Sequence, residues 1–156
     1  MQISPDRPAV LARAVLDTNV VLDLLVWNNP EADLLRRAVL ERQLVCLATT
    51  ESLAELRRVL GYEKLALSEE AAERIHTQYA ALVEQPAAQP IFAPIPRCSD
   101  RDDQKFIDLA MTQGANLLLS RDKALLKLGK RAKKIVPQLE ILTPSVWMAR
   151  QRAAAR

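Results

Sequence analysis

Four acidic residues stand where a short apolar run passes into a helix or where a helix begins, and they are Asp17, Glu55, Asp103 and Asp122. The apolar runs are typical of buried parallel strands, and ligands bind at the edge where such strands end. Carboxylates gathered at that edge would raise one another's pKa values unless a divalent cation lay among them. Ligation by oxygen alone favours Mg²⁺ or Mn²⁺ over zinc. We therefore predict a metal site in which these acids are both ligands and catalytic residues.

Each of these acids also has a purely structural interpretation. Glu55 could complete a capping box at the start of its helix, and Asp122 could be the N-cap of the helix that follows it. Acids at a helix start are stabilised by the macrodipole, which accounts for Asp100 and Asp102. Asp103, however, lies on the apolar face of its helix, where a solvated capping residue has no reason to be. Asp100 and Asp102 stay open as alternatives to Asp103.

Other classes of catalysis lack the residues that they need. The single histidine, His76, lies at the polar boundary of its helix, so no nucleophile–histidine–acid arrangement can be drawn. The three glycines all stand at helix ends, which excludes a glycine-rich phosphate loop. What remains is metal-assisted hydrolysis, in which the ion lowers the pKa of a water molecule and neutralises charge that develops on a phosphodiester.

Basic residues are unevenly distributed, although the net charge is only +3. Residues 121–134 contain seven bases against one acid, and residues 149–156 add three arginines. This pattern favours a polyanionic partner, but a solvated helix face with a basic tail would give the same pattern. The residues that we expect to contact the phosphates of such a partner are Arg121, Lys123, Lys130, Arg131, Lys133 and Lys134.

Short apolar runs alternate with amphipathic helices along the chain, which predicts parallel βαβ units with helices on both faces of the sheet. Strands are expected near residues 14–17, 44–48, 116–120 and 139–142, with a short edge strand near 91–92. Helices are expected over 18–27, 30–42, 49–60, 68–84, 99–114 and 123–128, and from Pro144 onward. The expected fold is α/β, a three-layer α/β/α sandwich with a central, mostly parallel sheet of four to five strands.

A chain of 156 residues, with 49% apolar and 26% charged residues, is sufficient for one globular domain. We expect a flexible extension over residues 1–13, a single domain over 14–148 and a basic tail over 149–156. No apolar run reaches the ~18 residues of a membrane span, and no signal peptide is recognisable. Cys46 and Cys98 are interpreted as reduced thiols, which predicts a cytoplasmic protein without a membrane partner.

Four motifs, taken in order, resemble those of the PIN-domain ribonuclease family. They read Leu16-Asp17-Thr18-Asn19, Glu55-Leu56-x-x-Val59-Leu60, Asp102-Asp103-x-Lys105-Phe106-x-x-x-Ala110 and Ser120-Arg121-Asp122-Lys123-x-Leu125-Leu126. Within that family the chain is most similar to VapC-like toxin components of type II toxin–antitoxin systems. The resemblance covers about residues 13–145, which is nearly the whole expected domain.

The resemblance implies a PIN-like fold and a Mg²⁺- or Mn²⁺-dependent endoribonuclease that acts on single-stranded or structured RNA. It also implies a homodimer and, for a toxin, inhibition by a cognate antitoxin protein. By position it makes Asp17, Glu55, Asp103 and Asp122 the acidic quartet. It makes Thr18, Asn19 and Ser120 supporting polar groups that orient a carboxylate or a water molecule.

Two functions from other classes stay open at this point. One is a catalytically silent PIN-fold module that binds RNA or a protein. The other is phosphotransfer at a strand-end aspartate, as in receiver domains or phosphatases of the haloacid dehalogenase type. Such a phosphatase requires Asp-x-Asp after the first strand, whereas this chain has Asp17-Thr18-Asn19.

Overall fold

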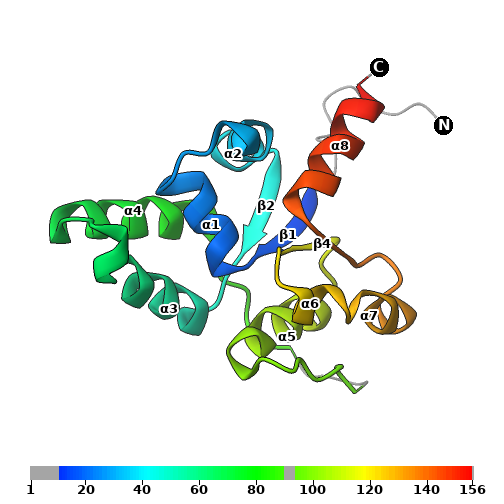
Figure 1. The fold of residues 1–156 in the computed structure, drawn as a ribbon. Helices are drawn as coiled ribbons and strands as arrows, with labels where there is room; N and C mark the ends of the chain where they lie inside the picture. Colours follow the sequence, from blue (N-terminus) through cyan, green and yellow to red (C-terminus); the bar gives the residue numbers. More distant parts are fainter. Residues whose placement is uncertain (1–10, 90–93, 156) are drawn as a thin grey trace.

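Five short strands pair in parallel, in the order β3-β2-β1-β4-β5, in the computed structural model, which describes residues 11–89 and 94–155 (Figure 1). The strands are β1 (Ala12–Leu16), β2 (Leu44–Leu47), β3 (Val83–Glu84), β4 (Leu117–Leu119) and β5 (Glu140–Leu142). Val15 in the central strand pairs with Leu47 on one side and Leu118 on the other. Because all pairs are parallel, the carboxyl ends of the five strands lie at the same edge of the sheet.

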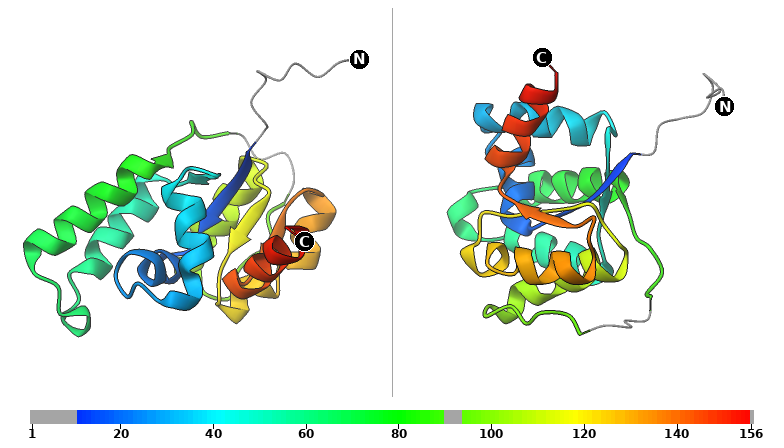
Figure 2. Two further views of the ribbon diagram at one scale, coloured as in Figure 1. Left: turned by 90° about the horizontal axis from the view of Figure 1, so that it is seen from above. Right: turned by 90° about the vertical axis from the view of Figure 1, so that its right-hand side faces the viewer.

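Helices cover both faces of the sheet, which confirms the predicted three-layer α/β/α sandwich (Figures 1 and 2). One face carries α1 (Thr18–Leu25), α2 (Asp33–Leu40), α3 (Thr50–Leu60), α4 (Glu69–Leu82) and α8 (Pro144–Ala154). The other face carries α5 (Gln104–Thr112), α6 (Lys123–Leu126) and α7 (Gly129–Ile135). The 3₁₀ turns η1 (Pro30–Ala32), η2 (Glu63–Leu65) and η3 (Arg101–Asp103) precede α2, α4 and α5.

The alternation of side chains along β1 builds a separate apolar core on each face. Ala14 and Leu16 belong to the cluster under α1 to α4 and α8, whereas Val15 belongs to the cluster over α5 to α7. Successive residues of a strand point to opposite faces, so one strand serves both cores. A sheet that is buried on both faces requires near-continuous apolar strands, and this explains why the apolar runs of the sequence predict the strands well.

Several elements differ from the expectation, and each difference has a local cause. The helix expected to reach residue 84 ends at Leu82, because Val83 and Glu84 pair with Cys46 and Leu47 as β3. Gly129 begins α7 rather than ending the preceding helix, so a helix in the basic segment was missed. The edge strand expected near residues 91–92 lies outside the described residues.

The two ends of the expected domain also shift. Strand β1 begins at Ala12, so the last residues of the expected extension belong to the sheet, and residues 1–10 lie outside the described residues. Helix α8 continues to Ala154, so most of the expected tail is helical. An ion pair between Arg150 and Glu140, at 2.7 Å, links this part of the helix to β5. No helix in the described ranges has the length and apolar character needed to cross a membrane.

Candidate active site

The predicted acids lie on segments that meet at the carboxyl edge of the sheet. Asp17 directly follows β1, and Asp122 lies three residues after the end of β4. Glu55 lies in α3, which follows β2, and Asp103 is the last residue of η3 before α5. The parallel topology therefore brings four segments that are distant in sequence to the same edge.

Asp17 is the most deeply buried of these acids, with only 4% of its surface exposed. Its Oδ1 accepts the backbone N–H of Val20 at 2.9 Å, which makes Asp17 the N-cap of α1. Its Oδ2 accepts a hydrogen bond from the Ser120 hydroxyl. Burial raises the pKa of the Asp17 carboxyl, while these two hydrogen bonds oppose that increase.

Ser120 connects Asp17 to Asp122. The Ser120 hydroxyl donates to Asp17, and its oxygen accepts the backbone N–H of Asp122 at 2.9 Å. Ser120 is completely buried, so both hydrogen bonds are shielded from water. These two hydrogen bonds hold the Asp17 carboxylate and the backbone of Asp122 in fixed positions relative to Ser120.

Three carboxylates form a compact group, which we call the carboxylate triplet: Asp100, Asp103 and Asp122. Each offers one carboxylate oxygen, and these oxygens all lie within 4.8 Å of one another. Asp100 and Asp122 cap η3 and α6, through the N–H of Asp102 at 3.0 Å and of Ala124 at 2.7 Å. Asp100 was expected only as a substitute for Asp103, whereas the structure brings both acids together.

Asp103 is the member of the triplet that has a buried carboxylate oxygen, Oδ2, without a hydrogen-bond partner in the described residues. Burial raises the pKa of Asp103 to about 7, followed by the Asp122 carboxyl, which acts through hydrogen bonding and charge, and then by the charges of Asp100 and Asp17. An unpartnered buried oxygen beside two further carboxylates matches the hard, all-oxygen donor set that Mg²⁺ and Mn²⁺ prefer. The residues present therefore fit a divalent cation.

Glu55 is on the same cavity wall but has a different environment. Its Oε1 lies 2.6 Å from the Lys105 ammonium group, and its Oε2 accepts from the Thr18 hydroxyl. Both partners of the ion pair are largely buried, with 11% of the Lys105 and 13% of the Glu55 side chain exposed. Glu55 therefore has its own positive partner and does not belong to the triplet.

The capping box expected for Glu55 is made by other residues. Thr49 is the N-cap of α3, and its hydroxyl accepts the N–H of Ser52 while the Ser52 hydroxyl accepts the N–H of Thr49. Because Ser52 completes the box, Glu55 is free to face the cavity. Lys105 was not among the predicted site residues, although it lies within the third motif and two positions after Asp103.

The acids line a cavity of about 270 Å³, which we call the acid cavity. Its lining includes Asp17, Glu55 and the carboxylate triplet, together with Thr18, Asn19 and Asp102. Asn19 and Asp102 are exposed on its wall, and Asp102 is not part of the triplet. Six further residues line the cavity and were not among the predicted site residues: Leu22, Trp27, Arg58, Val59, Tyr62 and Lys64.

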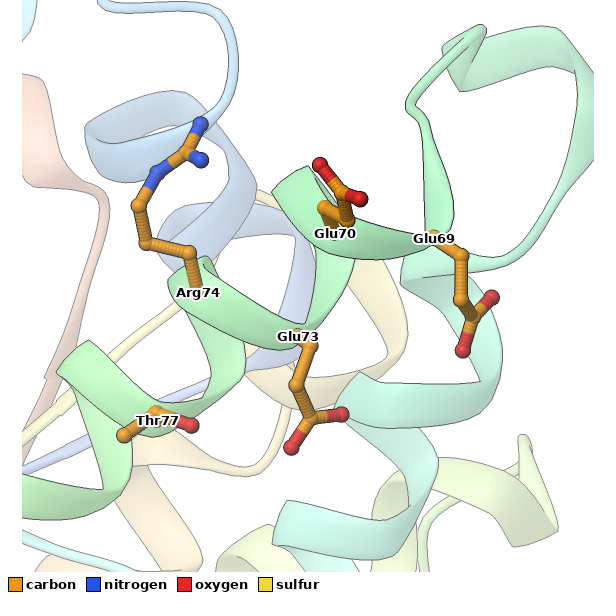
Figure 3. Close-up of a pocket in the computed structure, with 5 residues that line it drawn as sticks. All are labelled: Glu69, Glu70, Glu73, Arg74 and Thr77. Carbon is orange, nitrogen blue, oxygen red and sulfur yellow. The ribbon is translucent and has the colours of Figure 1, made fainter.

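A larger hollow of about 540 Å³ lies beside α4, and Figure 3 shows its lining. The side chains, which are Glu69, Glu70, Glu73, Arg74 and Thr77, all come from one helix. Glu69 and Glu73 pair with Arg57 of α3. The two glutamates thus have a structural role, since they hold α4 against α3. We therefore take the acid cavity, which contains the carboxylate triplet, as the candidate active site.

The six bases expected to contact RNA do not line the acid cavity. Arg121 forms an ion pair with Asp23 at 2.9 Å, and Lys123 is exposed at the start of α6. The other four bases are exposed on α7 and are Lys130, Arg131, Lys133 and Lys134. Helix α7 packs against β5, and in Figure 1 α6 lies between α7 and α3. The cations that line the cavity are Arg58 and Lys64.

His76 has a structural contact that leaves it outside the site. Its Nε2 lies 3.0 Å from the backbone oxygen of Leu53, so the ring bridges α4 and α3. Both cysteines are buried and free. Neither residue type contributes to the acid cavity.

The family model of the PIN domain matches residues 13–124, a range that includes the whole carboxylate triplet. Among solved structures, the chain is similar to the crystal structure of VapBC2 from Rickettsia felis bound to a DNA fragment from their promoter. The two share 14% sequence identity with a TM-score of 0.50, over 83% of this chain and 96% of that chain. At this level of identity the likeness demonstrates a common fold. The comparison with curated proteins gave no match.

Proposed function

This chain belongs to the PIN-domain family, whose members are generally nucleases, and from that premise we propose that it is a metal-dependent endoribonuclease. The proposed substrate is RNA, single-stranded or structured, and the proposed cofactor is Mg²⁺ or Mn²⁺. The observation that carries the proposal is the unpartnered Oδ2 of Asp103 within the carboxylate triplet. The phosphatase alternative is not supported, because Asn19 stands where that chemistry requires a second aspartate.

The residues of the acid cavity have distinct tasks in this proposal. The carboxylate triplet would hold the cation, and a divalent ion bound there would supply Lewis acidity toward a phosphodiester and would lower the pKa of a water molecule. The hydrogen bond from Ser120 fixes the orientation of the Asp17 carboxylate, which lines the cavity beside the triplet. Lys105 neutralises Glu55, which keeps a further negative charge from repelling the phosphate. Strand ends on a rigid sheet supply the fixed geometry that phosphoryl chemistry requires.

The proposed biological role is that of a toxin paired with an antitoxin. The likeness in fold to VapBC2 supports this role, and so do the family motifs of the sequence. A cytoplasmic location and a homodimer belong to the same proposal. Arrest of growth on induction of the chain, relieved by co-expression of the product of an adjacent gene, is the expected result. Growth that is unaffected by induction would argue for a nuclease without a toxic role.

The activity is tested by incubating a mixed-sequence single-stranded RNA with Mg²⁺, with Mn²⁺ or with EDTA. The wild-type protein should cut the RNA with either metal and not with EDTA. Asp17→Asn should remain folded and lose the cleavage, because asparagine still accepts the N–H of Val20 but removes a negative charge beside the triplet. Glu70→Gln, which changes an exposed acid on α4, is the matched control and should cut as the wild type does.

Two results would contradict the proposal. Equal cleavage by Asp17→Asn would mean that the site is assigned to the wrong residues. RNA binding without cleavage by the wild-type protein, under every metal condition, would favour a catalytically silent binding module.

A further inference from the structure

The exposed aromatic side chains are concentrated at the acid cavity. Five aromatic residues lie in the described ranges, and Trp147, Tyr79 and Phe106 are buried, with 6% or less of their surface exposed. Trp27 and Tyr62 are 49% and 44% exposed, and both line the acid cavity. A large aromatic ring is less stable in water than when it is buried, so two exposed rings beside one cavity indicate a binding site for a ligand.

Two cations accompany these rings. Arg58 of α3 and Lys64 of η2 line the same cavity and are exposed. Neither forms an ion pair within residues 11–89 and 94–155. The Lys64 ammonium group lies 5.9 Å from the centre of the Tyr62 ring. The Tyr62 ring and the Lys64 ammonium group thus lie side by side on the same surface. Lys105 differs from Lys64, because it forms an ion pair with Glu55.

We propose that Trp27 and Tyr62 form a base-binding subsite for an unpaired RNA strand, with Arg58 and Lys64 contacting the phosphates next to the stacked bases. This inference rests on the proposed function and deepens it, because it restricts the substrate to RNA whose bases are free to stack. The scissile phosphate lies at the carboxylate triplet, and the strand leaves the cavity across the ends of α1 and α3.

The combination of rings and unpaired cations fits a single strand better than the other classes of ligand. Aromatic side chains together with a positively charged path are the usual means of binding single strands, since every base has a face on which a ring can stack. In an A-form duplex the bases are paired and stacked on one another, so the rings could not reach them. A protein partner that covered the rings would also have to bury the acids of the same cavity, which is costly without matching cations.

Tryptophan fluorescence provides the test, because Trp27 is exposed whereas Trp147 is buried. The protein carries Asp122→Asn so that RNA is not consumed. It is titrated with an unstructured 12-nucleotide RNA and, separately, with the same sequence annealed to its complement. The single strand should quench the emission of Trp27, and the duplex should not. Removal of one stacking ring by Trp27→Leu or Tyr62→Leu should raise the Kd for the single strand by about tenfold or more. These Kd values are measured by the fluorescence anisotropy of an end-labelled RNA, because Trp27→Leu removes the tryptophan that reports binding.

Val146→Ala is the matched control, because Val146 is 43% exposed but lies on α8 and does not line the acid cavity. Its Kd should equal that of the parent protein. Unchanged Kd values in both leucine variants, or equal affinity for strand and duplex, would overturn the inference and leave the rings to a protein contact. Cleavage by the wild-type protein combined with that result would leave the nuclease proposal standing. Stacking without any cleavage by the wild-type protein would instead overturn the nuclease proposal alone.

Discussion

Asp17, Asp100 and Asp122 each use one carboxylate oxygen to accept a backbone N–H at the start of a helix or 3₁₀ turn. A carboxylate has two oxygens and about four acceptor positions, so a cap leaves capacity for a ligand. The structural and functional interpretations of these residues are therefore compatible at single positions. Asp103 differs, because it makes no side-chain cap and its Oδ2 has no partner within the described ranges.

The raised pKa of Asp103, about 7, makes the stability of the metal-free protein depend on pH. In the unfolded chain an aspartate has a pKa of about 3.9. Between these two values the folded protein holds a proton that the unfolded chain has released. The stabilising contribution is therefore fully present below about pH 4 and is lost as the pH rises through about 7. In EDTA, the free energy of unfolding should fall from pH 5 to pH 8.

Urea unfolding at several pH values measures this effect. Asp103→Asn should flatten the decline, since the variant cannot titrate at this position. Saturating Mg²⁺ should also offset the decline, because the cation binds the ionised carboxylate and does so more tightly as the pH rises. Identical pH dependence of Asp103→Asn and wild type would mean that Asp103 titrates as an ordinary surface acid.

At the scale of elements, the site depends on where helices begin. The N-cap of α3 is Thr49, and Ser52 rather than Glu55 completes its capping box, which leaves Glu55 to pair with Lys105. Asp122 is the N-cap of α6, so the cap and a proposed metal ligand are the same residue. A change at Asp122 should thus affect both the helix and the metal site, and the two effects can be separated.

Asp122→Asn and Asp122→Ala make this separation. Both remove the charge, but asparagine can still accept the N–H of Ala124 and alanine cannot. The alanine variant should be less stable than the asparagine variant by about 1 kcal/mol, the usual value of an N-cap. Neither variant should be stabilised by Mg²⁺ as the wild type is. Equal free energies of unfolding for the two variants would show that the cap has no role in α6.

For the whole molecule, the sequence predicts the layers and the edge at which the acids meet, because the apolar strands and the parallel connections determine both. It does not predict β3, since Val83 and Glu84 follow a helical pattern without interruption and become a strand only by pairing with β2. It does not separate Glu55 from the triplet either. That distinction depends on Lys105, whose contact with Glu55 spans 50 residues of sequence. Trp27 and Tyr62 were missed because exposure is a property of the folded chain.

The basic residues of α7 test how far RNA extends over the molecule. Lys130, Arg131, Lys133 and Lys134 changed together to glutamine should weaken the binding of a long RNA. The salt dependence of binding should also become shallower, by a slope of about 0.7 for each phosphate that the variant no longer neutralises. A tetranucleotide that only fills the acid cavity should bind equally well to both proteins. Binding measured against salt concentration decides the point, and an unchanged slope with the long RNA would make α7 a solvated face.

The measurement that tests the central claim most directly is a calorimetric titration of the metal-free protein with Mn²⁺. Asp103→Asn and Asp102→Asn form a matched pair, because both residues line the acid cavity and only Asp103 belongs to the carboxylate triplet. Wild type and Asp102→Asn should bind Mn²⁺ with similar affinity, and Asp103→Asn should bind it at least about tenfold more weakly. Equal affinity of Asp103→Asn and wild type, or no binding by the wild type, would contradict a metal site at the carboxylate triplet.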